Sequence, residues 1–249
     1  MSQSINKRLI ENDTKQLTGT KMINFSIKDD IAIIELDDGK ANVFSKTNSE
    51  AVIESLKKAQ SDAKATVIQA TGDKFSAGFD LSVMGGSEQD KNTMVLTGFQ
   101  MLQQIYSHPQ PLVVACNGHA LGMGAFTLLA ADTRIGAEGD YKIGLPETAG
   151  GMPFTRFLLC ILQAELKTSF IKTAALQSQM CNPTTAIDAG FLDMLVPPQA
   201  LQASAIKAAQ QLAQLPTEQY GYNKRELRQD TLKTMSNSLE ALSKAGSLA

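Results

Sequence analysis

The sequence predicts an α/β protein. Two apolar, β-branched segments, residues 66–70 (TVIQA) and 112–116 (LVVAC), are typical of buried strands. Each is followed by a glycine-bearing segment, residues 75–81 (FSAGFDL) and 117–124 (NGHALGMG), and the second leads into a helix predicted over 125–131. Strands that alternate with helices indicate a mostly parallel sheet with right-handed crossovers.

The other elements follow from local patterns. We expect strands at 22–27 and 31–36 joined in a hairpin at Asp29-Asp30, an amphipathic helix over 45–60, a polar loop over 85–92, a helix over 93–106 and a short strand at 133–136. Beyond residue 155 the pattern is almost all helical, and one helix starts at Pro197-Pro198 and ends at Pro216. The chain thus divides into an N-terminal extension (1–21), an α/β core (22–197) and a C-terminal helical region (198–249).

Composition excludes several classes of function. The chain has 249 residues, of which 43% are hydrophobic, and its 23 basic and 25 acidic residues give a net charge of −2. A nucleic-acid partner is not expected, because such proteins carry a basic surface. No apolar run is long enough for a membrane span, and residues 1–21 lack the apolar stretch of a signal peptide, so we expect a cytoplasmic protein that does not bind membranes.

Cysteine and histidine are sparse. Cys116, Cys160 and Cys181 are odd in number and lie in unremarkable contexts, so free thiols in a reducing compartment are predicted. His108 is expected in a surface loop, and His119 in a structural role beside the second glycine segment. These residues show no metal-ligand spacing, and we predict no metal.

The glycine segments are the strongest functional signal. Glycine lets a backbone approach a ligand closely, and the first N–H groups of a helix have no partner within it. Two such N–H groups that converge on one oxygen would form an oxyanion hole. The alternative is that the glycines only make tight strand-to-helix turns, as many α/β proteins require.

Five motifs then occur together. They are residues 76–81 (SAGFDL), 117–124 (NGHALGMG), 131–135 (ADTRI), 144–147 (GLPE) followed by Gly151, and 186–197 (AIDAGFLDMLVP). On these motifs, residues 22–230 resemble the crotonase superfamily, the enoyl-CoA hydratase/isomerase family. The resemblance implies a crotonase-like β-β-α superhelix (the ClpP/crotonase fold) with a C-terminal helical trimerisation region, in a homotrimer or a hexamer built as a dimer of trimers. It also implies an enzyme of fatty-acid metabolism whose substrate is an acyl-CoA thioester, with coenzyme A as part of the substrate and no permanently bound cofactor.

The resemblance assigns site residues. It makes the backbone N–H groups of Phe79 and Met123 the donors of the oxyanion hole. It also implies contacts to substrate from Ser76, Ala77, Gly78, Gly122, Gly124, Phe126 and Phe99. Many family members carry a lysine where this chain has Ser82, so a phosphate contact is missing or comes from Lys46, Lys74 or Lys224-Arg225. The alternative for Lys224, Arg225 and Arg228 is a solvated helix face.

The carboxylates suggest the reaction. Hydratases of the family use two glutamates; this chain has Glu147 at one position and Phe126 at the other. A single base can move a proton from C2 to C4 of a 3-enoyl thioester, whereas addition of water needs a base and an acid. Thr155 replaces the acid of the family's dienoyl-CoA isomerases. The residues therefore predict a 3,2-enoyl-CoA isomerase with Glu147 as acid and base; the alternatives are an enoyl-CoA hydratase, which is a lyase, and a non-catalytic CoA-thioester-binding member.

Overall fold

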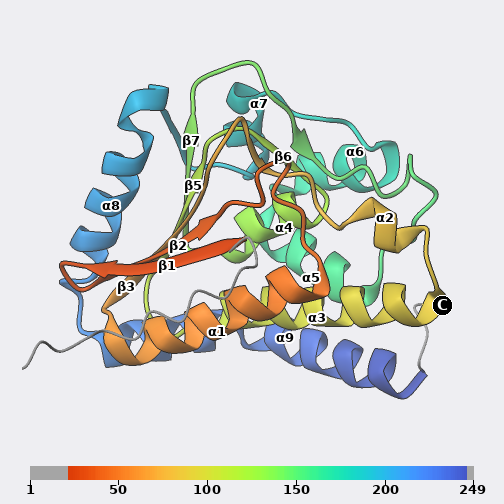
Figure 1. Cartoon of the computed structure of the whole chain (residues 1–249), viewed down its shortest axis with the longest axis horizontal. Helices are drawn as coiled ribbons and strands as arrows, with labels where there is room; N and C mark the ends of the chain where they lie inside the picture. Colours follow the sequence, from red (N-terminus) through yellow and green to blue (C-terminus); the bar gives the residue numbers. More distant parts are fainter. Residues whose placement is uncertain (1–21, 246–249) are drawn as a thin grey trace, which may run out of the picture.

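The computed structural model describes residues 22–245, and the predicted extension over 1–21 lies outside them. The chain forms an α/β structure with two sheets surrounded by helices (Figure 1). The larger sheet has the order β1-β2-β3-β5-β7-β9 and the smaller one the order β4-β6-β8. The larger sheet contains β1 (Ile23–Lys28), β2 (Ile31–Leu36), β3 (Ala65–Ala70), β5 (Leu112–Cys116), β7 (Thr133–Ala137) and β9 (Met194–Val196).

The predicted hairpin is confirmed. β1 and β2 pair antiparallel, and both turn residues, Asp29 and Asp30, have positive φ (50° and 62°). Two such residues match the right-handed twist of the strands they connect. All later pairings in the larger sheet are parallel.

Alternate residues of the central strands face two apolar clusters. Val67 and Val113 pack with β7 and with α8 (Leu201–Leu212), whereas Ile68 and Val114 belong to the larger core on the other face. That face is covered by α1 (Lys46–Asp62), α3 (Glu88–Ser107) and α4 (Met123–Ala130) (Figure 1). Burial on both faces explains why the strands are continuous apolar runs.

The smaller sheet was not predicted. Its strands, β4 (Lys74–Ser76), β6 (His119–Leu121) and β8 (Ile143–Gly144), have two or three residues each and lie inside or beside the glycine motifs. Such short strands carry no alternating pattern. β9 was also missed in a stretch predicted to be almost all helical.

Two predicted boundaries were wrong. The loop expected over 85–92 is mostly helix, because α2 (Leu81–Met84) is followed closely by α3, whose N-cap is Ser87. The Ser87 hydroxyl accepts from the Asp90 N–H, a capping pattern that the sequence already contains. The helix expected from residue 125 begins two residues earlier, at Met123. This start matters for the site because it makes the Met123 N–H one of the first, unpaired N–H groups of α4.

Four more helical segments lead to a long last helix. They are α5 (Arg156–Glu165), α6 (Thr168–Gln177), α7 (Pro183–Ala189) and the 3-10 turn η1 (Pro198–Ala200) before α8. The last helix, α9 (Thr217–Ala245), packs against α3 and α5 of the same chain. Both long C-terminal helices therefore contact the core, and a role of residues 198–249 in a trimer stays a prediction.

A buried ion cluster joins α9 to the core and corrects the expectation for its basic residues. Lys224 Nζ lies 2.6 Å from Asp132 Oδ2, and Arg228 Nη1 lies 3.1 Å from Asp132 Oδ1. Asp132 Oδ2 also accepts from the Leu112 N–H at 2.8 Å. Lys224 and Arg228 therefore belong neither to a solvated face nor to a phosphate site, because their charges are buried and paired.

His108 was expected on the surface and is buried. Its Nε2 lies 3.3 Å from the Thr66 hydroxyl, and burial lowers its pKa to about 4. The prediction failed because α9 covers the loop: Lys224 reaches the Gln110 carbonyl two residues further on. A contact across 114 residues leaves no local signal in the sequence.

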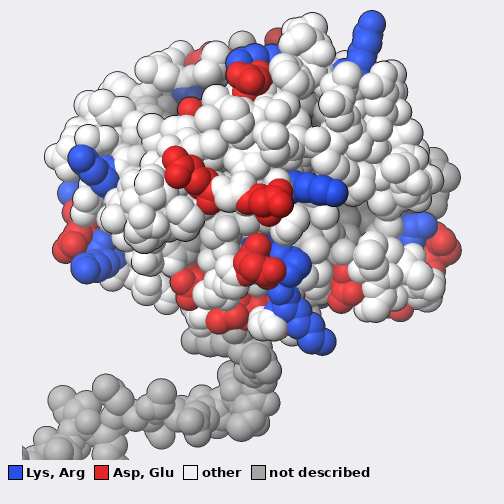
Figure 2. All heavy atoms as spheres, turned by 90° about the horizontal axis from the view of Figure 1, so that it is seen from above, with Lys and Arg blue, Asp and Glu red and all other residues white. Residues whose placement is uncertain are grey.

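The surface charge is mixed. On the face shown in Figure 2, basic and acidic side chains lie interspersed among large uncharged areas. Within residues 22–245, no helix combines the length and the apolar character that crossing a membrane requires. The described residues also contain no group of three or more His, Cys, Asp or Glu side chains that could hold a metal ion. The three cysteines are buried free thiols, as predicted.

Candidate active site

The fold brings the two glycine segments side by side. β4 pairs in parallel with β6, so Ser76 lies opposite Ala120. Gly78 has φ +93°, and a Cβ there would lie 2.8 Å from the Leu121 carbonyl oxygen. A Cβ at Gly124 would lie 2.6 Å from the Ser76 carbonyl oxygen. The glycines are therefore required by close backbone contact between the segments, as well as by turn geometry.

Two backbone N–H groups are left over where the segments meet. In the bridge between Phe44 and Phe79, the Phe44 N–H donates to the Gly78 carbonyl and the Asp80 N–H donates to the Phe44 carbonyl. This bridge does not use the Phe79 N–H. Met123 begins α4 after Gly122 (φ +51°), so its N–H has no acceptor one turn earlier. Neither group donates a hydrogen bond to a residue in the described part of the chain. A Cβ at Gly78 would lie 3.4 Å from the Met123 nitrogen, so the Met123 N–H lies next to the residue that precedes Phe79.

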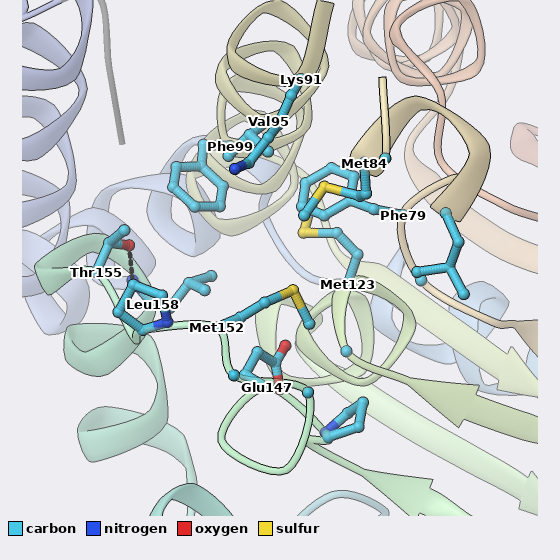
Figure 3. A pocket seen from close by; sticks show the side chains of 18 of the residues that line it. Phe79, Met84, Lys91, Val95, Phe99, Met123, Glu147, Met152, Thr155 and Leu158 are labelled. Atoms are coloured by element: carbon cyan, nitrogen blue, oxygen red, sulfur yellow. Dashed lines mark hydrogen bonds between the residues drawn. The ribbon is translucent and has the colours of Figure 1, made fainter. Parts of the chain in front are cut away.

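Phe79 and Met123 both line a cavity of about 660 Å³ (Figure 3). Its walls are mostly apolar and come from the loop after β4, α2, α3, the start of α4, the turn after β8 and the start of α5. The residues around it are Ala77, Gly78, Phe79, Leu81, Met84, Gly85, Glu88, Lys91, Val95, Phe99, Gly122, Met123, Pro146, Glu147, Gly150, Gly151, Met152, Pro153, Thr155 and Leu158.

Seven of the ten site residues expected from the sequence line this cavity: Ala77, Gly78, Phe79, Phe99, Gly122, Met123 and Glu147. Ser76, Gly124 and Phe126 lie behind its wall. The Ser76 hydroxyl accepts from the Gly78 N–H at 3.1 Å, so it holds the turn that presents Phe79. His119 has a structural contact, as expected, since its Nδ1 accepts from the Lys142 N–H.

Glu147 lies beside Gly122, the residue before Met123, and lines the same cavity as Phe79 and Met123. A Cβ at Gly122 would lie 3.2 Å from Glu147 Oε1, and the glutamate is only 8% exposed. Its Oε2 is buried and has no hydrogen-bond partner among the described residues. The turn that carries it is closed by Met152 N–H donating to the Glu147 carbonyl at 2.8 Å. Burial raises the pKa of Glu147 to about 7, which makes it able to take and return a proton near neutral pH.

The position of the family's other glutamate holds no acid. Phe126 is fully buried in α4, and its ring packs edge-on against Phe154 with centroids 6.4 Å apart. Thr155 caps α5 by accepting from the Leu158 N–H. Among the described residues, the cavity lining has one more carboxylate, Glu88, whose side chain is 79% exposed.

Sequence reasoning missed Lys91 in the cavity wall and Gly98 behind the wall residue Phe79. A Cβ at Gly98 would lie 2.5 Å from Phe79 Cε1, so this glycine makes room for the Phe79 ring. Glycine within a predicted helix was the available signal, because it usually marks a close contact. Lys91 carried no signal, since a lysine at the start of a helix is ordinarily solvated. The proposed phosphate ligands Lys46 and Lys74 pair with their neighbours Glu50 and Asp73.

Comparison with solved structures defines the class of fold. An enoyl-CoA hydratase (EchA3) from Mycobacterium marinum superposes with a TM-score of 0.85 at 31% identity, over 90% of this chain and 98% of that one. Two structures of a Mycobacterium tuberculosis protein match over 90% of this chain at 32% identity, with TM-scores of 0.86 and 0.85. One is described as a probable enoyl-CoA hydratase and the other as an enoyl-CoA isomerase. A human mitochondrial delta3-delta2-enoyl-CoA isomerase, 22% identical with a TM-score of 0.82, shares the fold. The chain therefore has the crotonase fold.

The family follows from the sequence match. The sequence model described as "Enoyl-CoA hydratase/isomerase" covers residues 26–245. A probable enoyl-CoA hydratase from Bacillus subtilis is 32% identical over 130 residues, and one from Rhodobacter capsulatus is 32% identical over 137 residues. These matches span about half the length of each curated relative, 50% and 53%. The chain belongs to the enoyl-CoA hydratase/isomerase family.

Proposed function

We propose that the protein isomerises 3-enoyl-CoA thioesters to 2-enoyl-CoA thioesters, with Glu147 as the single acid and base. The observation that supports this most directly is one buried carboxylate with an unpaired oxygen, Glu147, in the same cavity wall as Phe79 and Met123, whose N–H groups have no acceptor among the described residues. The corresponding second position holds the buried ring of Phe126. An aromatic ring can neither accept nor donate a proton, so this position supplies no second acid or base.

The chemistry needs only these groups. Ionised Glu147 takes a proton from C2 of the 3-enoyl thioester, and the electrons move onto the thioester oxygen to give a dienolate. The N–H groups of Phe79 and Met123 stabilise this oxygen, and one such donor contributes on the order of 10²–10³ in rate. Glu147 then returns the same proton to C4, so the double bond moves and no water, metal or redox cofactor is consumed.

Enoyl-CoA hydration is the second candidate, because the curated relatives are named probable enoyl-CoA hydratases. Hydration needs a second group to position water or protonate the enolate. In the described part of the cavity lining, the only other carboxylate is Glu88, on the exposed N-terminal turn of α3. A hydratase would therefore depend on Glu88, and Glu88→Gln would abolish the hydration of crotonyl-CoA.

A paired assay tests the proposal. The purified protein should convert 3-hexenoyl-CoA to 2-hexenoyl-CoA and hydrate crotonyl-CoA at less than about one hundredth of that rate, since a lost acid or base typically removes 10²–10⁴ in rate. Glu147→Gln should abolish isomerisation and leave the binding of hexanoyl-CoA unchanged. The matched control is Glu226→Gln, at an exposed glutamate of α9. Equal rates on the two substrates, or an active Glu147→Gln variant, would contradict the single-carboxylate mechanism.

A further inference from the structure

Lys91 occupies an unusual place in the cavity wall. Glu88, Lys91, Val95 and Phe99 are spaced by three or four residues along α3, so they share one face of the helix, and all four line the cavity. The solvent exposure of these side chains decreases along the row, from the exposed Glu88 through the partly buried Lys91 to the buried Val95 and Phe99. Figure 3 shows the Lys91 side chain lying along the helix, with its nitrogen toward Val95 and Phe99.

The ammonium group has only a weak partner in the described structure. The Lys91 side chain is 29% exposed, and Nζ lies 3.5 Å from Glu88 Oε1, whose own side chain is 79% exposed. Such a solvated pair contributes little and is easily exchanged for another anion. Within residues 22–245, Lys91 is also the one basic side chain that lines the cavity.

Resting on the isomerase function proposed above, we propose that Lys91 determines substrate specificity by binding a carboxylate at the far end of the acyl chain. The natural substrate is then a thioester of a dicarboxylic acid. The side chains around the space between Glu147 and Lys91 in Figure 3 are mainly apolar, among them Phe79, Met123, Val95 and Phe99, which suits a chain of methylene groups. A few polar groups in a mainly apolar pocket fix which ligand is bound.

The alternative occupants fit the wall less well. A plain alkyl tail would cover the Lys91 ammonium without pairing it, which is unfavourable. A terminal carboxylate would instead form a charge-assisted hydrogen bond. The other anions of the substrate are the phosphates of coenzyme A. The apolar stretch of wall between Glu147 and Lys91 offers them no donors, and we treat a phosphate contact as an outcome of the test.

Binding of saturated thioesters tests this directly, because they can be neither isomerised nor hydrated. Isothermal titration calorimetry would compare monocarboxylic thioesters (butyryl- to decanoyl-CoA) with the dicarboxylic thioesters of the same lengths (succinyl- to sebacyl-CoA). We expect a preference of about tenfold or more for the dicarboxylic thioester at one chain length, as one charge-assisted bond typically provides. Lys91→Met should remove this preference, and Lys91→Arg should retain it. Lys57→Met, at an exposed lysine of α1, is the matched control and should behave as the wild type.

Two results would overturn the proposal. One is the absence of a preference at every chain length in the wild-type protein. The other is a Lys91→Met variant that weakens both series equally, because this would assign Lys91 to a coenzyme A phosphate. Failure of the isomerase function would show itself differently, as absent turnover both of 3-hexenoyl-CoA and of the corresponding 3-enoyl thioester with a terminal carboxylate, with the dicarboxylic preference in binding intact.

Discussion

Replacing Glu147 by Gln should stabilise the protein at high pH while it removes activity. The carboxylate is 8% exposed and has one oxygen without a partner, so its charged form is poorly solvated in the folded state. Glutamine keeps the shape and cannot ionise. The folded protein therefore carries an unfavourable charge that the variant lacks, and a trade-off between stability and activity is expected at this residue.

The size of the effect follows from the pKa. Burial raises the pKa of Glu147 from its ordinary 4.5 to about 7. Because the folded state holds its proton more tightly, the stability that this group contributes is complete below pH 4.5 and is lost as the pH rises through 7. At about 1.36 kcal/mol per pKa unit, the full loss is ~3 kcal/mol. Most of it, ~2.5 kcal/mol, falls between pH 5 and pH 8.5.

Urea unfolding of the wild type, Glu147→Gln and Glu226→Gln at pH 5 and pH 8.5 would measure this. The stability of Glu147→Gln relative to the wild type should rise by ~2.5 kcal/mol over that range, which corresponds to roughly 5–10 °C in Tm for a chain of this size. The Glu226→Gln variant should track the wild type. In the same pH range, kcat/KM of the wild type for 3-hexenoyl-CoA should rise through an apparent pKa near 7, because only ionised Glu147 can take the C2 proton.

A constant difference between the wild type and Glu147→Gln at both pH values would refute this reasoning. It would mean that the carboxylate has an ordinary pKa in the folded state. The site would then lack the raised pKa on which the proposed acid and base role depends.

Two further predictions concern the surroundings of the site. Gly98→Ala should lower kcat/KM by about tenfold, because the new methyl group would displace the Phe79 ring and with it the Phe79 N–H donor. Overpacking should lower the free energy of unfolding in urea by only ~1–3 kcal/mol, and a variant with full activity would contradict the predicted clash. Asp132→Asn should lower the free energy of unfolding by ~3–5 kcal/mol, because Lys224 and Arg228 would lose the carboxylate between them. A loss of less than about 1 kcal/mol would show that other contacts hold α9.

Elements with a strong local signal were predicted from the sequence. The hairpin at Asp29-Asp30, the helix capped by Ser45 and the buried strands β3 and β5 depend on turn, capping and apolar patterns that lie within a few residues. The N-cap of α3 at Ser87 had the same kind of signal, since a serine is followed three residues later by an acid. The start of α3 was therefore predictable from the sequence.

The missed features depend on contacts between distant residues. β4, β6 and β8 are defined by pairing and not by pattern. Asp132 meets Lys224 across 92 residues, and nothing near either residue shows that its charge will be buried. The pKa of Glu147 has the same dependence. Its rise follows from burial and from an Oε2 without a partner, and both follow only from the assembled site.

Asp132 and Glu147 show how a buried carboxylate for stability differs from one suited to catalysis. Asp132 lies between two cations and also accepts from the Leu112 N–H, so its charge is satisfied and joins α9 to the sheet. Glu147 has no such partner and faces a cavity. Within residues 22–245, the carboxylate of Glu147 thus keeps one oxygen unpaired in the cavity wall that Phe79 and Met123 share. The glycines are required by close backbone contact and are therefore a feature of the fold, whereas the isomerase reaction that we propose depends on the side chains at positions 126 and 147.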